Sequence, residues 1–380
     1  MLNTNIGRPT RNLFQQLITT ARKDLFLTIA LLAAILTSFF GLPRAEYIDF
    51  KVILCLFELM VIVKAFEEYA LLQAIAVGIL RRCGDERLLT QALCLITFVF
   101  AMFVTNDVAL LTMIPILIVI SRKSSYNMTL PAVFVTVAAN LGSSLTPIGN
   151  PQNLFLYSHY NMTLGGFLSQ ALPLGGAGLA LVLAMGFFVR PAQIQVVVVE
   201  GAMRRGWRLP AFGVLGLAAV LSVVGALPWL PTFFVVAAAT AVMNPRILLR
   251  ADYKLLLTFV CIFIAIGNIT HWPALKGWLA ALTGTPAATY GTALLTSQLI
   301  SNVPATILLA PFASSSLALF HGVNIGGLGT PIASLASVIT YRLFASEYPD
   351  KRQAFLGAFS LYNFGCLLLL GAVFFVILAV

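Results

Sequence analysis

The chain has 380 residues, 60% of them hydrophobic and 9% charged, and its formal net charge is +10. Its mean hydropathy of +0.96 leaves too little polar surface to cover a soluble globule, so the composition excludes a soluble protein and predicts a polytopic membrane protein in contact with the lipid bilayer. The positive charge does not indicate nucleic-acid binding, because 19 of the 23 basic residues fall in short loops between apolar segments, as the positive-inside rule predicts for cytoplasmic loops.

The first apolar segments predict an all-α fold that begins at a cytoplasmic N-terminus. Residues 24–42 are expected to cross outward and residues 51–80 to return, since a helix of roughly 20 residues spans the hydrocarbon core. At about 1.5 Å per residue, the next segment is too short to cross twice, so it predicts a re-entrant hairpin. This hairpin covers residues 88–121 and has a polar tip made of Thr105, Asn106 and Asp107.

Residues 129–160 carry the polar stretch NLGSSLTPIGNPQNLFL in an otherwise apolar helix. Each Pro removes a backbone donor and clashes with the preceding turn, so the helix is expected to break. Free backbone groups at membrane depth are tolerated only where they are buried in protein or line a cavity, which predicts an ion or substrate site. The alternative is a kinked helix whose polar residues hold neighbouring helices together. The amide side chains of Asn140, Asn150, Gln152 and Asn153 supply neutral oxygens and N–H donors for such a site.

The second half of the chain predicts the same features in the same order. After four crossings between residues 172 and 269, the apolar segment 289–320 is interrupted by SQLISNVPA and predicts a second hairpin. A second broken helix is expected at 322–342, and residues 354–380 make the last crossing, which places the C-terminus outside. This gives about nine full spans and two hairpins. The candidate binding residues of this half are Ser301, Asn302, Asn324, Gly326 and Thr330.

Three sequence matches relate the two halves. TNDVALLTMIP (105–115) aligns without gaps with SNVPATILLAP (301–311), and NLGSSLTPI (140–148) aligns with NIGGLGTPI (324–332). DFK and DYK each open the helix that precedes a hairpin, the first running inward and the second outward. The halves, residues 1–209 and 210–380, are therefore predicted to be inverted repeats of one transporter unit. The second half has IASLAS where the first has IGNPQN, so one ion site is expected to be weaker or absent.

These motifs resemble a known family. TNDVALL, NLGSSLTPIGNPQNL and SNVPA are similar to the ion transporter superfamily, in the branch with the arsenite permease ArsB, the NhaD-type sodium/proton antiporters and the YbiR-like predicted anion permeases. The resemblance covers most of the chain and implies an elevator-type transporter in a bacterial inner membrane. Each repeat would contain a hairpin and an unwound helix, and the protein would form a homodimer. The resemblance places the family's binding residues in the two halves of the chain. In the first half they are Thr105, Asn106, Asp107, Asn140, Gly142, Thr146 and Asn150, and in the second half they are Ser301, Asn302, Asn324, Gly326 and Thr330.

One departure from the wider superfamily bears on the substrate. Its dicarboxylate carriers have Ser-Asn-Thr at both hairpin tips, whereas the third position here is Asp107 in one tip and Val303 in the other. Citrate or succinate is therefore less expected than a small inorganic ion.

Asp107 is the ionisable residue of the first tip. Because an ionisable group at mid-membrane is costly, Asp107 is predicted to couple transport to Na⁺ or H⁺. The alternative is a cap on the second hairpin helix. A carboxylate repels an anion unless it is protonated or paired with a cation, which favours a neutral hydroxide such as arsenite, a cation, or an anion accompanied by Na⁺ or H⁺. The Na⁺ site itself is predicted at Thr105, Asn106, Asn140 and Asn150.

Glu58 is a second ionisable residue deep in a predicted span. Further along the same helix, Lys64 and Glu68 are four residues apart and are predicted to pair. For Glu58, a structural ion pair or scaffold contact is favoured over a role in proton relay.

These patterns favour a secondary active transporter that moves a small inorganic anion or oxyanion by an elevator mechanism, coupled to Na⁺ or H⁺ and without a cofactor. The alternatives are a Na⁺/H⁺ antiporter and an arsenite efflux permease. An enzyme is not expected, because the sequence has no HExxH, GxSxG or P-loop motif. An ion channel is disfavoured, because almost no span carries a polar stripe from end to end.

Overall fold

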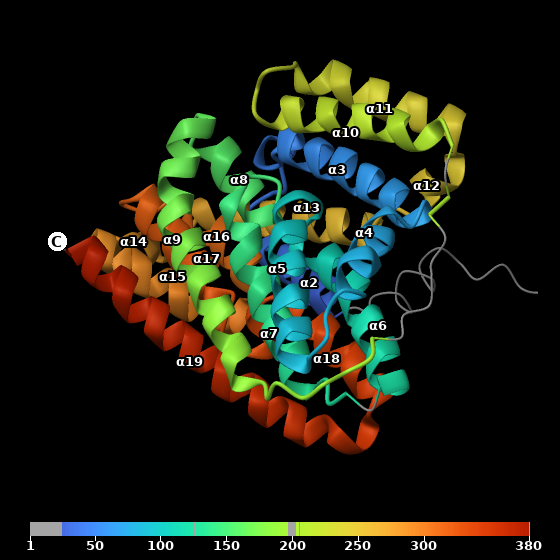
Figure 1. The fold of residues 1–380 in the computed structure, drawn as a ribbon. Helices are drawn as coiled ribbons and strands as arrows, with labels where there is room; N and C mark the ends of the chain where they lie inside the picture. The colour runs from blue at the N-terminus through green and yellow to red at the C-terminus, as the bar shows by residue number, and fades with distance from the viewer. Residues whose placement is uncertain (1–24, 125, 197–202, 205, 380) are drawn as a thin grey trace, which may run out of the picture. The chain divides into compact units, whose positions relative to one another are not determined.

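The structure is a computed structural model that describes residues 25–124, 126–196, 203–204 and 206–379. These residues form eighteen α-helices and five short 3-10 helices and contain no strand (Figure 1). The all-α prediction is therefore confirmed for the described residues. The predicted cytoplasmic N-terminus and its basic residues Arg8, Arg11, Arg22 and Lys23 lie outside them.

The chain divides into two compact units, of which the smaller contains residues 25–49 and Asp252–Leu275. Its helix α2 (Leu25–Thr37) packs along α13 (Tyr253–Thr270), and a short 3-10 turn, Ala45–Tyr47, packs against α13 as well. The Nδ2 atom of Asn268 donates to the hydroxyls of Thr37 and Ser38, both at 3.3 Å. An amide thus joins the end of α13 to the end of α2.

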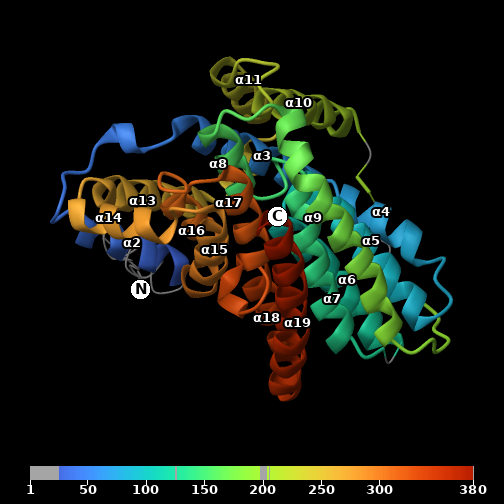
Figure 2. The ribbon, with the colours of Figure 1, turned by 90° about the vertical axis from the view of Figure 1, so that its left-hand side faces the viewer.

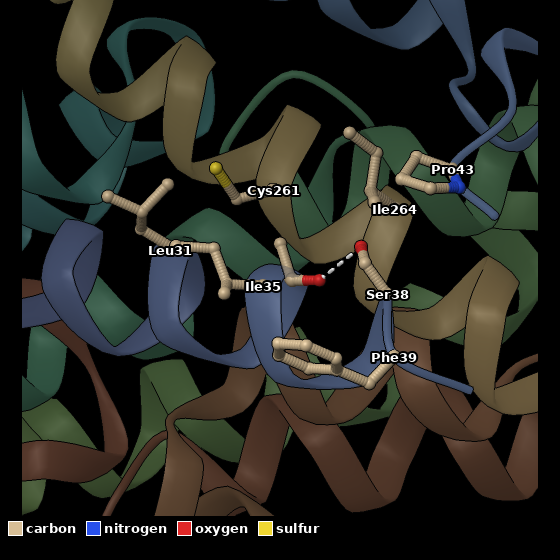
Figure 3. Close-up of a pocket in the computed structure, with 8 residues that line it drawn as sticks. Leu31, Ile35, Ser38, Phe39, Pro43, Cys261 and Ile264 are labelled. Atoms are coloured by element: carbon tan, nitrogen blue, oxygen red, sulfur yellow. Dashed lines mark hydrogen bonds between the residues drawn. The ribbon is translucent and has the colours of Figure 1, made fainter. Parts of the chain in front are cut away.

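The smaller unit also contains a cavity of about 370 Å³ between α2 and α13 (Figure 3). Its polar lining is limited to Ser38, whose hydroxyl donates to the carbonyl oxygen of Ala34 at 2.6 Å. A lining of this kind offers no set of ligands for an ion. The lining residues are Leu31, Ala34, Ile35, Ser38, Phe39, Pro43, Cys261 and Ile264.

The larger unit contains residues 50–251 and 276–380. The described residues of its first stretch, 50–251, form ten helices: α3 (Phe50–Glu68), α4 (Leu71–Leu80), α5 (Glu86–Val104), α6 (Asn106–Ser124), α7 (Thr129–Gly142), α8 (Pro151–His159), α9 (Leu164–Met185), α10 (Arg208–Val223), α11 (Trp229–Met243) and α12 (Pro245–Leu249). The boundary between the units falls within α14 (Pro273–Leu282). The remaining helices are α15 (Pro286–Ile300), α16 (Asn302–Leu309), α17 (Ser316–Gly326), α18 (Leu335–Glu347) and α19 (Arg352–Ala379).

Helices of the larger unit pack in three groups. Helix α3 packs against α10, α11 and α12 around a buried apolar cluster that includes Ile62, Phe212 and Val236 (Figure 1). Helices α5 and α6 pack against α7 and α9, and α15 and α16 pack against α17 (Figure 2). Helix α18 packs on α6 and α7 of the second group, and α17 contacts α7, which connects the third group to the second.

Four helices of the described chain are long and apolar enough to cross a membrane, judged by length and composition alone. They are Glu86–Val104, Leu164–Phe188, Tyr253–Thr270 and Pro349–Leu378. The helices Phe26–Thr37, Leu71–Leu80, Thr129–Leu145, Arg208–Val223 and Trp229–Met243 are apolar but have only 10–17 residues. Length therefore supports a multi-pass protein, and the prediction of about nine spans includes these shorter helices.

The bounds of several predicted segments differ from the structure. Each arm of the first hairpin is a helix of 19 residues, and α5 begins at Glu86, where the Asp85 side chain accepts from the backbone N–H of Leu88 at 2.8 Å. Nineteen residues are within the length range of a full span, so the expectation that this segment is too short to cross twice is wrong, and the re-entrant hairpin stays a prediction. Residues 316–320, predicted as part of the second hairpin, belong to α17, which the Ser315 side chain caps. The predicted span 51–80 is two helices, because Ala70 adopts a positive φ of 54°.

The predicted ion pair between Lys64 and Glu68 is wrong. Lys64 instead pairs with Glu67, one turn along the helix, at 2.7 Å. Glu68 accepts from two arginines that other segments supply, Arg204 at 3.1 Å and Arg250. Two guanidinium groups therefore bind the Glu68 carboxylate, which the helical spacing had predicted to pair with Lys64. The ion pair favoured for Glu58 is also not found within the described residues.

Candidate functional site

The two hairpin tips have the same unusual backbone conformation. Thr105, between α5 and α6, has φ 71° and ψ 150°, and Ser301, between α15 and α16, has φ 75° and ψ 153°. Side chains other than glycine rarely occupy this region, and each such residue costs of order 1–3 kcal/mol. Strain of this kind persists where the surrounding structure imposes it, often at functional sites. Both predicted tips are therefore local breaks of the same geometry.

The two helix breaks occur where the sequence places Pro and Gly. Helix α7 ends at Gly142, and α8 begins at Pro151, with the Asn150 side chain accepting from the backbone N–H of Asn153 at 3.0 Å. Helix α17 ends at Gly326, and α18 begins only at Leu335. Because each Pro lacks a donor, neither helix can continue through its TPI motif.

A threonine joins each break to the neighbouring hairpin. The Thr146 hydroxyl donates to the carbonyl oxygen of Met102, and the Thr330 hydroxyl donates to that of Gln298 at 3.1 Å. Each acceptor lies three residues before its tip residue, Thr105 or Ser301. The Gln298 side chain adds a further contact, because its Oε1 atom accepts from the backbone N–H of Thr330 at 2.9 Å.

Replacing either threonine by valine should test this equivalence. We expect Thr146→Val and Thr330→Val each to lower the free energy of unfolding by about 1 kcal/mol, because each removes one hydrogen bond and keeps the side-chain volume. Thermal unfolding in detergent measures the effect. Thr292→Val, which removes a hydroxyl bond to the Leu282 carbonyl away from the breaks, is the control for an ordinary hydrogen bond. A neutral Thr146→Val or Thr330→Val would contradict the role in anchoring the hairpin.

Two glycines allow each broken helix to approach its hairpin closely. A Cβ atom added to Gly142 would lie 2.2 Å from the carbonyl oxygen of Phe98, and one added to Gly326 would lie 2.8 Å from Cβ of Ser297. Both distances are shorter than real contacts. The predicted candidate Gly142 therefore lies against the backbone of α5, and Gly326 lies against the Ser297 side chain of α15.

Buried side-chain amides connect the first tip to both breaks. The Nδ2 atom of Asn106 donates to Oδ1 of Asn140 at 3.1 Å, and the same oxygen accepts from the Ser334 hydroxyl at 2.9 Å. The backbone N–H of Asn106 donates to the carbonyl oxygen of Gly149 at 3.1 Å. A single oxygen of Asn140 thus holds the start of α6 and the start of α18.

The network continues across the second break. The Asn150 amide donates to the Ser143 hydroxyl at 3.0 Å and to Oδ1 of Asn324 at 3.4 Å. The Asn324 amide donates in turn to Oδ1 of Asn153 at 2.9 Å. Since the Ser143 hydroxyl also donates to the carbonyl oxygen of Asn140 at 2.9 Å, one set of hydrogen bonds runs from Asn106 to Asn324.

The cross-connections follow one pattern. Asn140, near the end of α7, bonds to Ser334, which precedes α18, and Asn324, near the end of α17, bonds to Asn150, which precedes α8. The N-terminal end of each second half-helix is thus tied to the first half-helix of the other break. In the second tip, the Ser301 hydroxyl donates to the carbonyl oxygen of Ala333 at 3.3 Å.

The helix ends at this network can stabilise either an anion or a cation. Helices α6, α8, α16 and α18 all start here, and their N-terminal N–H groups favour anions. The ends of α5, α7, α15 and α17 supply carbonyl oxygens that favour cations. Asp107, the second residue of α6, is the ionisable residue among the candidates and is half-buried. The site is thus built mainly from neutral dipoles with one carboxyl group beside them.

The predicted Na⁺ ligands do not all meet. Asn106 and Asn140 are in contact, but the Asn150 amide faces Ser143 and Asn324. The three Asn Oδ1 atoms already accept hydrogen bonds. A cation bound by all four predicted residues would therefore have to share or replace these bonds.

The sequence analysis missed three residues that belong to the network: Ser143, Gln298 and Ser334. Ser334 occupies the position that Asn150 has in the first half, so the alignment of the halves contained a signal for it. Gln298 aligns with Met102, so the alignment of the halves did not point to it. The only sign of its role in the sequence was a polar side chain within an apolar helix. Asn302 lies beside the break of α17, where a Cβ on Gly327 would be 2.8 Å from its Nδ2 atom.

Comparisons with known proteins identify the family of this chain. The family described as CitMHS, citrate transporter, matches residues 17–321. Inner membrane protein YbiR of Escherichia coli is 33% identical over 333 residues, covering 85% of this chain and 89% of the relative. Uncharacterized transporter MJ0456 of Methanocaldococcus jannaschii is 32% identical over 324 residues, covering 84% and 88%. Silicon efflux transporter LSI3 of Oryza sativa is 26% identical over 160 residues, covering 41% and 33%. This chain belongs to the citrate transporter family of membrane transporters.

Proposed function

We propose that this chain is a secondary active transporter that moves a small inorganic anion or oxyanion, coupled to Na⁺ or H⁺, by an elevator movement. The observation that carries the proposal is the buried amide network, in which Asn140 and Asn324 each bond to the residue that precedes the second half-helix of the other break. Half-helix ends that meet at polar side chains, in a chain of apolar helices, are typical of transporter binding sites.

Paired features support two inverted repeats, residues 1–209 and 210–380. The tips share one backbone conformation, and the two threonines bond to equivalent carbonyl oxygens. Gly142 and Gly326 approach equivalent arms of the hairpins. These pairs obey the alignment found in the sequence, which is why we infer a repeat with pseudosymmetry rather than two unrelated kinks.

The substrate proposal rests on the charges near the site. Among the candidate residues there is no Lys or Arg to neutralise a tricarboxylate, so the family's description as a citrate transporter does not by itself assign citrate to this chain. The name of the rice relative concerns silicon efflux, which favours a small inorganic substrate. A Na⁺/H⁺ antiporter is the second candidate, supported by the carboxyl group of Asp107 at the tip.

The proposed location is a bacterial inner membrane, with the N-terminus in the cytoplasm and the C-terminus outside. The name of the Escherichia coli relative, an inner membrane protein, supports this location. The basic loops support the orientation, because such loops are typically cytoplasmic. A homodimer is proposed from the resemblance to elevator carriers.

The first test is ligand-dependent thermal stability of the detergent-purified protein. We expect Na⁺, Li⁺ or a pH change to stabilise the wild type, and Asp107→Asn to lose this response. A ligand at 100 times its Kd adds about 2.7 kcal/mol, which is readily measured. The anion panel, with cation present, contains arsenite, phosphate, sulfate, succinate and citrate.

Asp85→Asn is the matched control, because Asp85 is also a carboxylate at a helix N-terminus but caps the far end of α5. It should keep the cation response, since Asn caps a helix about as well as Asp. If cations and pH have no effect while an oxyanion stabilises both wild type and Asp107→Asn, the coupling role of Asp107 is wrong. If only cations act and no anion does, the antiporter alternative is favoured.

A further inference from the structure

Glu58 is a buried carboxyl group that the proposed transport site does not use. It lies in α3, has 0% of its surface exposed, and neither carboxyl oxygen has a hydrogen-bond partner among the described residues. An ionised carboxylate in such surroundings is very costly, because burial removes its hydration without supplying donors. A neutral carboxylic acid avoids most of this cost.

The register of the neighbouring helices indicates what surrounds Glu58. Helices α3 and α10 run antiparallel, because the rings of Tyr69 and Phe212 are 6.0 Å apart while a Cβ on Gly216 would lie 3.0 Å from Ile62. Glu58 is one turn before Ile62 on the same face. Beyond Gly216 on α10, the buried residues are Ala219, Ser222 and Val223.

Ser222 is the polar residue of these three. It is 1% exposed, and its hydroxyl also has no hydrogen-bond partner within the described chain. Two facing helices thus each bring an unsatisfied polar group to about the same level. Buried polar groups are normally paired, so two unpaired groups on packed helices are unusual, and the carboxyl group of Glu58 is the one that would carry a charge.

The charged groups around this position are all distant along their helices. On α3 itself, Lys64 is engaged with Glu67, and Glu68 with two arginines. Helices α4 and α11 contain no charged residue. The nearest titratable side chain on α3 is Cys55, a buried thiol one turn before Glu58. The other titratable or charged side chains of the elements packed on α3 lie near helix ends: Lys51 of α3, Tyr157 and His159 of α8, Arg208 of α10 and Arg246 of α12.

We propose that the carboxyl group of Glu58 is a proton-binding site at the contact of α3 with α10, on a different set of helices from the amide network. The bound proton makes Glu58 a neutral acid, which avoids the cost of a buried charge. Loss of the proton leaves a charge in an apolar helix contact and weakens the packing of α3 on α10 and α11. The site takes up H⁺, and the residues that the structure describes contain no cluster of three His, Cys, Asp or Glu side chains that could hold a metal ion instead.

Infrared spectroscopy of protein labelled with ¹³C at the glutamate carboxyl carbon tests the proposal directly. Because only glutamates carry the label, the signal of Asp107 is separated from that of Glu58. We expect one protonated glutamate band per chain at neutral pH, and Glu58→Gln should lose it. Glu67→Gln, which changes an ion-paired glutamate of the same helix, should keep it.

A second measurement follows the consequence of proton loss. The thermal midpoint of the wild type should fall as pH rises, because deprotonation charges a buried group, whereas Glu58→Gln should lose this slope. If labelled wild type shows no protonated glutamate at neutral pH, the proposal is wrong, whether or not Glu58→Gln folds. Neither readout requires the transported ion. Failure to detect a protonated Glu58 therefore does not contradict the transport proposal, and failure of every anion to stabilise the protein does not contradict the proton site at Glu58.

Discussion

Replacing Gly142 by alanine is expected to destabilise the protein strongly and to abolish the cation or anion response. The new Cβ would lie 2.2 Å from the carbonyl oxygen of Phe98 and 2.7 Å from its Cα atom, so the backbone of α5 or α7 has to move. Overpacking of this kind costs about 3 kcal/mol and outweighs the gain of up to about 1 kcal/mol from replacing a helical glycine. Because α5 and α7 carry the first tip and the first break, the movement also disturbs the amide network.

Thermal unfolding of the purified protein measures this effect, and Gly176→Ala is the matched control. Gly176 lies in α9, and a Cβ there meets no atom within 4 Å, so alanine should be neutral or slightly stabilising. Gly326→Ala should be milder than Gly142→Ala, because the nearest atoms belong to the Ser297 side chain rather than to the backbone. A stable Gly142→Ala protein with normal ion responses would show that this close approach is not needed.

Replacing Asn140 by leucine is expected to have the second-largest effect. Leucine keeps the approximate volume but removes the oxygen that accepts from both Asn106 and Ser334. Each donor left buried without a partner costs about 1–3 kcal/mol, so we expect a loss of about 2 kcal/mol or more. Since these bonds hold the starts of α6 and α18, ion-dependent stabilisation should disappear as well.

Asn268→Leu is the control that separates a loss of stability from a loss of the ion response. Asn268 is also buried and bonds to two hydroxyls, but in the smaller unit between α13 and α2. Its replacement should lower stability while leaving the ion response of the larger unit intact. If Asn140→Leu behaves like Asn268→Leu, with lower stability but a normal ion response, the amide network is a structural support and not the binding site.

Much of this site could be predicted from local sequence. Pro147 and Pro331 interrupt their helices wherever they are placed, because the missing N–H is a property of the residue itself. The tips were predictable for a similar reason, since Thr105 and Ser301 interrupt long apolar segments with polar residues. The alignment of the halves then paired Asn140 with Asn324 before any geometry was known.

The pairing of side chains could not be predicted in the same way. Glu68 was assigned to Lys64 by helical spacing, but arginines from distant segments hold it. Ser334 and Gln298 were not chosen, because a serine or a glutamine has no special character until its acceptor is known. The bounds of α5 and α17 also differed, since the capping side chains of Asp85 and Ser315 extend them.

The sequence by itself determined the membrane class, the all-α fold and the positions of both tips and both breaks, because hydropathy and proline act through local chemistry. Tertiary structure alone decided that Asn140 meets Ser334, that Asn324 meets Asn150, and that Glu58 is buried without a hydrogen-bond partner within the described chain. Such facts depend on which helices pack together and in what register. Small shifts between helices determine them, and no local pattern encodes those shifts.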